Sequence, residues 1–301
     1  VLSNGTATMY GSTKAANFLN IEGYEDHGVE VLFFWDAEKK LVATAVNVAC
    51  PAQEVEGRTA VNADFWHETR VALRKNYGKG LIVLAWAGAG GDQSPHLMWR
   101  KDAEARMLKA RGLTRLQEIA RRIARGVDDA YEVAKNDLHT DPAFTHQVKD
   151  IQLPRRIVTD QDVINAKKEI AALSEQEKNG RNTGRRRGWH QKTVDRFNEQ
   201  KTDKLYPMEL HTIRIGDIAI CTNPFELFTD FGIRMKVGSK ATQTFIVQLA
   251  GTSGYYLATT KAVLGGGYSA VINSNLVGPE GGDVLVKETV TEINAMWPKK
   301  P

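Results

Sequence analysis

The chain has 301 residues, 42% of them hydrophobic and 25% charged, which is typical of a globular protein long enough to bury a sizeable core. No apolar run approaches the ~18 residues that cross a bilayer, and two cysteines do not make a disulfide framework. The net charge is +4 with the excess between Arg155 and Lys204, so one basic segment in a near-neutral chain gives little support to nucleic-acid binding.

The first predicted elements alternate between strands and a helix. VEVLFFW (29–35) and LVATAVNVA (41–49) are rich in β-branched and aromatic residues, and the turn DAEKK between them predicts a hairpin. Apolar residues at helical spacing predict a helix over 63–78 that ends at Gly78. LIVLAWA (81–87) is a short continuous apolar run, which predicts a strand buried on both faces.

The middle of the chain is predicted to be helical and increasingly polar. An apolar stripe predicts one long amphipathic helix over 101–135, which Gly112 or Gly126 can interrupt. The range 137–207 is then expected to be a basic helical insertion or lid, with the arginine-rich linker NGRNTGRRRG inside it. Its two predicted helices are QDVINAKKEIAALSEQEK (161–178) and WHQKTVDRFNEQK (189–201).

Core-like patterns return after the insertion. Residues 209–222 predict two strands around a turn at Gly216, residues 225–239 predict a helix, and TFIVQLA (244–250) predicts another buried strand. Buried strands that alternate with amphipathic helices favour an α/β fold, with a mixed β-sheet, flanking helices and the polar helical insertion.

Function in an α/β sheet collects beyond the carboxyl ends of buried strands. Small or reactive residues follow four predicted strands. They are Cys50-Pro51, the run AGAGG (87–91) before Ser94, Asn223 to Glu226, and GTSGYY (251–256). The glycines let a backbone approach a ligand closely, but a tight turn requires glycine equally well, and the pattern does not decide between the two.

Five motifs in order resemble the neutral/alkaline, non-lysosomal ceramidase family. They are GDQSP, NVACPAQ followed by AVNADFW, NPFELFTDFG, YLATTKAVLGGGY and GPEGG, and together they run from about residue 30 to the end. Members of that family are zinc-dependent amidases that split the N-acyl bond of ceramide. The resemblance implies the same reaction here, on ceramide or a related lipid-like amide, and it implies that residues 1–301 are the C-terminal portion of a larger ceramidase-like catalytic domain.

The resemblance also implies roles for particular residues. Ser94 matches the family's essential serine, and Tyr268 matches a tyrosine that stabilises the oxyanion. Glu226 and Tyr256 match two zinc ligands, and Cys50 stands as the third possible ligand. Zinc accepts thiolate and carboxylate ligands, and in a catalytic site it keeps one position open for water.

Two departures from the family pattern point to an alternative function. Cys50 stands where the family places a histidine before proline, and no His-x-His occurs in the chain, so one further zinc ligand is expected from residues upstream. A thiolate makes zinc a poorer Lewis acid than an imidazole does. The alternative is a non-catalytic, ceramidase-like binding domain, and a Cys50–Cys221 disulfide is another possibility if the two strand ends are adjacent.

Each candidate residue also has a structural interpretation. Ser94 before proline can be a turn residue, and Asn223 with Glu226 three positions later can form a helix capping box. Tyr256 can simply pack against the core, and Tyr268 behind three glycines can anchor a loop. These alternatives stay open on sequence alone.

The expected partner is a lipid-like amide substrate. The run Arg185, Arg186, Arg187 is expected to be a solvated loop or a peripheral contact with anionic lipid head groups. No nucleic-acid partner is expected. The family resemblance suggests an extracellular or periplasmic location.

Overall fold

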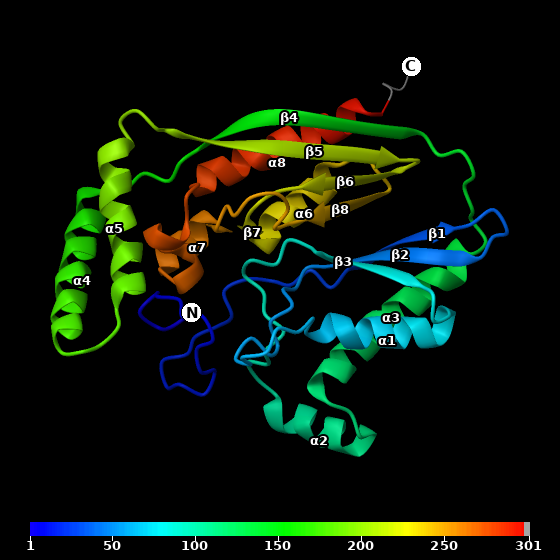
Figure 1. Ribbon diagram of the computed structural model, residues 1–301, viewed down its shortest axis with the longest axis horizontal. Coiled ribbons are helices and arrows are strands. Elements are labelled where there is room, and N and C mark those ends of the chain that lie inside the picture. Colours follow the sequence, from blue (N-terminus) through cyan, green and yellow to red (C-terminus); the bar gives the residue numbers. More distant parts are fainter. Residues whose placement is uncertain (298–301) are drawn as a thin grey trace.

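A computed structural model describes residues 1–297 and shows strands arranged in sheets with helices packed against them (Figure 1). The strands are β1 (Val29–Trp35), β2 (Leu41–Val48), β3 (Ile82–Ala87), β4 (Phe144–Pro154), β5 (Leu205–Ile215), β6 (Ile218–Thr222), β7 (Glu226–Leu227), β8 (Gln243–Val247) and β9 (Tyr256–Leu257). The helices are α1 (Phe65–Tyr77), α2 (Lys101–Arg111), α3 (Arg115–Ala134), α4 (Asp160–Lys178), α5 (Gly184–Glu199), α6 (Thr229–Gly238), α7 (Thr260–Gly265) and α8 (Pro279–Ala295), with 3₁₀ turns η1 (Tyr268–Ala270) and η2 (Ile272–Ser274).

The sheets are mixed, which confirms the predicted α/β fold. β1 pairs with β2 in the predicted antiparallel hairpin, and β2 pairs with β3 in parallel. β4, β5 and β6 are antiparallel, and β6 pairs with β8 in parallel. The short strands β7 and β9 form a separate parallel pair. β3 and β8 belong to different sheets, but their carboxyl ends meet. There the Gln248 N–H donates to the Ala87 carbonyl at 3.0 Å.

The two larger hydrophobic cores lie between the sheets and their helices. Helices α1 and α3 pack against each other, and α3 packs on β1, while α6 and α8 pack against β8, β4 and β5 (Figure 1). The largest fully buried side chains of these cores include Phe65, Leu73, Phe225, Phe231, Leu257 and Leu210. No helix within residues 1–297 carries an apolar stretch long enough to span a bilayer.

Local signals account for the ends of the first helices. The Asp64 carboxylate accepts the Phe65 N–H at 2.7 Å and caps α1, which ends at Gly78 with φ at 110°. The predicted long helix is broken at Gly112, whose φ of 65° ends α2 in the left-handed region. Gly126 does not interrupt α3; it lies against Val29, where an added Cβ would approach the valine side chain to 3.2 Å.

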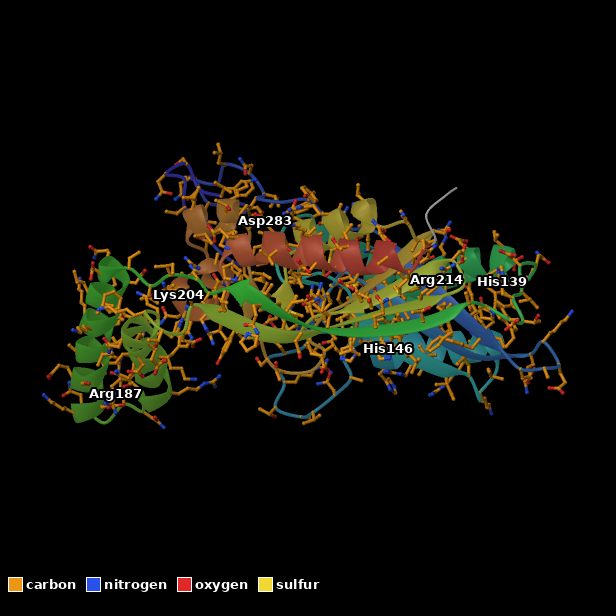
Figure 2. All side chains as sticks on the ribbon, turned by 90° about the horizontal axis from the view of Figure 1, so that it is seen from above. His139, His146, Arg187, Lys204, Arg214 and Asp283 are labelled. Carbon is orange, nitrogen blue, oxygen red and sulfur yellow. The ribbon has the colours of Figure 1, made fainter. Side chains whose placement is uncertain are left out.

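Helices α4 and α5 form a hairpin that projects from one end of the molecule. Figure 2 shows Arg187 on this hairpin, at the opposite end from His139. The hairpin lies within the range 137–207 expected to be a helical insertion. The same range also holds the strand β4, which the sequence analysis did not predict. β4 is an edge strand with alternating exposed positions, so polar residues dominate its pattern.

Candidate functional site

A pocket of about 350 Å³ lies where the segments after β2, β3 and β8 meet the short pair β7–β9. Its wall includes backbone from the glycine run and side chains of both polar and apolar kinds. Residues that line it include Met9, Tyr10, Gln53, Trp66, Gly90, Gly91, Gln93, Glu226, Gln248, Leu249 and Tyr256. Several distant stretches of the chain therefore contribute to one hollow, and most of them follow strand ends, as the rule for α/β sheets predicts.

The glycine run is needed for close backbone packing. A Cβ on Gly90 would approach the Ala49 backbone to 2.8 Å, and a Cβ on Gly91 would approach the Glu226 carbonyl oxygen to 2.2 Å. The Gly91 N–H also donates to the Leu227 carbonyl at 2.8 Å. The run thus lies between the loop after β2 and strand β7. Its glycines permit the approach of other backbone segments that together build the pocket wall.

Gln248 holds these segments together, and the sequence analysis did not single it out. Its side chain is buried, and its Oε1 accepts the Leu227 N–H at 2.9 Å and the Gly90 N–H at 3.3 Å. One amide oxygen therefore fixes β7 relative to the glycine run. The sequence feature that could have indicated Gln248 is its place as a lone polar residue at the end of an otherwise apolar strand.

Gln248→Met is expected to lower the free energy of unfolding by about 2 kcal/mol, because two buried N–H groups lose their acceptor while the side-chain volume is nearly kept. Chemical denaturation of the purified variant measures this loss. Gln243→Met, at the partly exposed start of β8, is the matched control and is expected to change stability by less than about 0.5 kcal/mol. Equal stabilities for the two variants would contradict the role of Gln248.

Glu226 and Tyr256 form a pair across the β7–β9 ladder. They are register partners, and the Glu226 N–H donates to the Tyr255 carbonyl at 2.8 Å. Burial raises the pKa of Glu226, and a hydrogen bond from Tyr256 partly offsets this rise. Burial and the bond to Glu226 also raise the pKa of Tyr256, which keeps its hydroxyl protonated. The pair therefore presents a proton donor beside a carboxyl group that binds protons more readily than usual.

Tyr268 extends this pair toward solvent. Its ring lies edge-on to Tyr256 with 6.1 Å between ring centroids. Its side chain is exposed, and its carbonyl accepts the Ser274 hydroxyl at 2.6 Å. On its other side Trp189 of helix α5 lies 6.2 Å away, centroid to centroid. Tyr268 therefore stands at the mouth of the pocket, between the Glu226–Tyr256 pair and the helical hairpin.

Ser94 and Cys50 lie beside the pocket lining rather than on it. Ser94 follows the lining residue Gln93, and its Oγ accepts the His96 N–H at 3.1 Å within a turn. Cys50 precedes the lining residue Pro51, and its thiol donates to the Pro51 carbonyl at 3.6 Å. Burial, together with the nearby Asp64 and Glu54 carboxylates, raises the pKa of Cys50 to about 12. The structure brings three of the five predicted residues together and sets these two next to them.

Two of the structural alternatives do not occur. Glu226 lies on strand β7 and helix α6 begins only at Thr229, so the capping box with Asn223 is wrong. The Asn223 side chain instead accepts the Phe225 N–H at 3.1 Å in a turn. Cys50 and Cys221 are both free thiols, so the possible disulfide between them is not formed.

The donor set for a metal ion is limited. Glu226 and Tyr256 supply two neighbouring oxygen donors, and the Cys50 thiol is protonated and donates to the Pro51 carbonyl. Within residues 1–297 no three His, Cys, Asp or Glu side chains gather as a metal-binding group. The donors described here therefore do not by themselves fit a zinc ion, which takes three protein ligands in a catalytic site.

Comparison with known proteins relates the fold to ceramidases. The structure is similar to that of neutral ceramidase from Pseudomonas aeruginosa, with a TM-score of 0.58 and 13% identity over 90% of this chain and 47% of that one. It is similar to the same degree, over 88% and 47%, to a ceramidase complexed with C2. No protein-family model and no curated protein matches the chain. At this low identity the likeness establishes a ceramidase-like fold, and the chain spans about half the length of those ceramidases.

Proposed function

We propose that this chain hydrolyses an N-acyl amide bond, in ceramide or a related lipid-like amide, at the pocket that Glu226 and Tyr256 line. The observation that carries the proposal is the position of this pair. A carboxyl group of raised pKa and a protonated phenol face one cavity, at the strand ends of a ceramidase-like fold. Perturbed proton-transfer groups in a cavity are typical of active sites.

Glu226 is proposed to move the proton that the reaction requires. As a carboxylate it takes a proton from a water molecule, whose oxygen then bonds to the amide carbonyl carbon. The resulting carboxylic acid gives that proton to the amide nitrogen as the carbon–nitrogen bond breaks, which yields a free fatty acid and an amine. The raised pKa of Glu226 suits both halves of this cycle, because a group that titrates nearer to neutral pH both accepts and returns a proton.

The phenols are proposed to stabilise the negative charge that develops on the carbonyl oxygen. Tyr268 lies edge-on to Tyr256 at the pocket mouth, so its hydroxyl is a candidate donor to that oxygen. Ser94 is proposed to assist from the adjoining turn, because the neighbouring residue Gln93 lines the cavity. Removal of one such donor typically slows an acyl-transfer reaction about 100-fold.

Zinc binding remains a prediction of the family resemblance. When bound, zinc would supply an acidified water and a Lewis acid for the carbonyl. Since the described donors do not complete a zinc site, the steps proposed above use only side chains of this chain. Metal analysis of the freshly purified chain tests the prediction. About one zinc per chain, lost in a Glu226→Ala variant, is the expected result if Glu226 is a ligand, and an unchanged metal content in that variant contradicts its role.

A second candidate function is lipid binding without hydrolysis. The observation that favours it is Cys50, a protonated thiol bonded to the adjacent carbonyl at the position where the resemblance implies a histidine ligand. One experiment separates the two functions. The purified chain is incubated with a short-chain fluorescent N-acyl sphingosine, with added zinc and with a chelator, and both bound substrate and released fatty acid are measured.

Release of fatty acid above the rate of a Glu226→Gln variant supports hydrolysis. Saturable binding without any release, with and without zinc, contradicts the proposed hydrolysis and supports the binding function. An absence of both binding and release contradicts both functions.

A further inference from the structure

The mouth of the pocket carries apolar side chains that face solvent. Tyr10, Leu249 and Tyr268 are 49%, 54% and 56% exposed. Tyr10 and Leu249 line the pocket, and Tyr268 contacts the lining residue Tyr256. These three side chains are called the apolar rim below. An exposed apolar group beside a cavity is typical of a surface that meets another apolar phase.

The backbone is held in an unfavourable conformation at two of the three rim residues. Of the six non-glycine residues with positive φ in residues 1–297, Tyr10 has φ at 55° and Leu249 at 58°, and Tyr255, next to Tyr256, has φ at 57°. Bulky residues seldom adopt the left-handed region, and such outliers cluster at functional sites. The fold therefore fixes apolar side chains at the pocket mouth against the local preference of the backbone.

A cluster of unpaired positive charge lies on the helical hairpin, whose residue Trp189 contacts the rim residue Tyr268. The turn between α4 and α5 and the first turn of α5 carry Arg181, Arg185 and Arg186, all exposed, and none of them forms an ion pair with another residue of the 1–297 range. These three arginines are called the basic tip. Arg187 differs from them, because its guanidinium pairs with Glu177 at 3.3 Å. Figure 2 shows Arg187 at the projecting end of the molecule.

The stability of α5 does not explain the basic tip. The N-terminus of a helix carries partial positive charge, which disfavours cations there and favours acids. The first turn of α5 holds no acidic residue, and the Thr183 hydroxyl donates to the Leu173 carbonyl instead of capping the helix. Arg185 and Arg186 therefore oppose the helix dipole, and a ligand of negative charge would account for their position.

Helix α5 connects the basic tip to Tyr268 of the apolar rim. Arg185 and Trp189 are four residues apart on α5, so their side chains lie on the same face of the helix, about 6 Å apart along its axis. Trp189 donates its indole N–H to the Asn273 carbonyl at 3.1 Å and lies against Tyr268. One helix face thus leads from the positive charges to the aromatic side chain at the pocket mouth.

We propose that this surface docks on an anionic lipid bilayer, with the basic tip among the head groups and the apolar rim facing the acyl chains. Rim and charge together match a membrane interface, which offers negative charge outside and hydrocarbon beneath it. A nucleic acid would engage the arginines but leave the rim facing water. The inference rests on the proposed function, since docking would let a lipid amide pass from the bilayer into the pocket without crossing water.

The test is sedimentation of the purified chain with vesicles of phosphatidylcholine alone or mixed with phosphatidylserine. Arg185→Glu combined with Arg186→Glu is expected to weaken binding to the anionic vesicles by about 25-fold or more, because each basic residue near such a surface contributes about fivefold. The melting temperature of this variant is expected to stay equal or rise, since glutamate suits a helix N-terminus. Lys75→Glu combined with Lys79→Glu is the matched control: it changes the charge equally at exposed positions of the distant α1 end and is expected to retain binding.

A second variant tests the rim separately. Leu249→Asn keeps the left-handed backbone, which asparagine tolerates, and is expected to weaken vesicle binding about tenfold through loss of apolar insertion. Equal binding of all variants, equal binding to neutral and anionic vesicles, or tighter salt-dependent binding to a DNA duplex than to vesicles would overturn the proposal. Hydrolysis of a soluble short-chain amide, measured on the Arg185/Arg186 double variant, is expected to be unchanged. A loss of vesicle binding with intact hydrolysis therefore bears on docking alone, and an inactive chain that still binds vesicles bears on the proposed hydrolysis alone.

Discussion

Gly91→Ala is expected to lower the free energy of unfolding by about 3 kcal/mol, because the new methyl group has no room. A Cβ at this position would lie 2.2 Å from the Glu226 carbonyl oxygen and 2.6 Å from its carbonyl carbon, both backbone atoms that cannot rotate away. Either the glycine run or strand β7 must move. Since β7 carries Glu226, the same substitution is expected to reduce catalysis as well as stability.

The matched control for this substitution is Gly80→Ala. An added Cβ at Gly80 meets no atom within 4 Å, and its φ lies outside the left-handed region. The control is therefore expected to be neutral or slightly stabilising. Urea unfolding of both variants, followed by circular dichroism, measures the difference. Gly91→Ala with the stability of Gly80→Ala would show that the glycine run does not pack against β7 as described.

Glu226→Gln is expected to reduce kcat for amide hydrolysis by about 100-fold or more with little change in KM, because glutamine keeps the shape of the site but transfers no proton. Tyr256→Phe is expected to have a smaller effect on kcat and to raise the pKa of Glu226 further, because the hydrogen bond from Tyr256 offsets part of the rise that burial causes. Glu38→Gln, in the exposed turn between β1 and β2, is the control and is expected to keep full activity.

Glu226→Gln also has a predicted pH dependence of stability. Burial raises the pKa of Glu226 in the folded chain, so the folded state binds this proton more tightly than the unfolded state does. Its stabilising contribution is complete below the unfolded pKa and is lost as the pH rises through the raised folded value. Glu226→Gln is therefore expected to gain stability relative to the unmodified chain as the pH rises above about 4, the pKa of a glutamate in the unfolded chain. A stability difference that is constant over this range would contradict the raised pKa.

Much of the fold could be predicted because its signals are local. Asp64 and Gly78 mark the two ends of α1, Gly112 ends α2, and Gly216 with a φ of 62° forms the turn between β5 and β6. Each of these positions depends on a few neighbouring residues. The alternation of buried strands with amphipathic helices then indicates the α/β class, which the mixed sheets confirm.

The elements that build the pocket could not be predicted in this way. β7 and β9 are each two residues long, and they form because segments 30 residues apart lie side by side. Strands this short leave no periodic pattern in the sequence from which they could be predicted. The pattern instead suggested that Glu226 belongs to a helix. Helix α8 was not among the predicted elements, and its Gly281 and Gly282 lie buried against Val277 and Phe231.

The candidate site was indicated by the order of motifs that resemble a known family, more than by the chemical character or spacing of the residues. Resemblance selected Glu226, Tyr256 and Tyr268, which the fold brings together, and it selected Ser94 and Cys50, which lie beside the pocket lining. It could not select Gln248 or Tyr10, since their importance depends on which loops meet in three dimensions. The closest packing in the site, between Gly91 and Glu226, joins residues more than 100 positions apart in the chain.

The most direct test of the account is a crystal structure of the chain with a non-hydrolysable N-acyl amide analogue. We expect the amide group within hydrogen-bond distance of Glu226 or Tyr256, with its acyl chain leaving the pocket between Tyr10 and Leu249. An analogue bound elsewhere on the chain, or a pocket that stays empty at saturating analogue, would contradict the assignment of this cavity as the site where the amide is held.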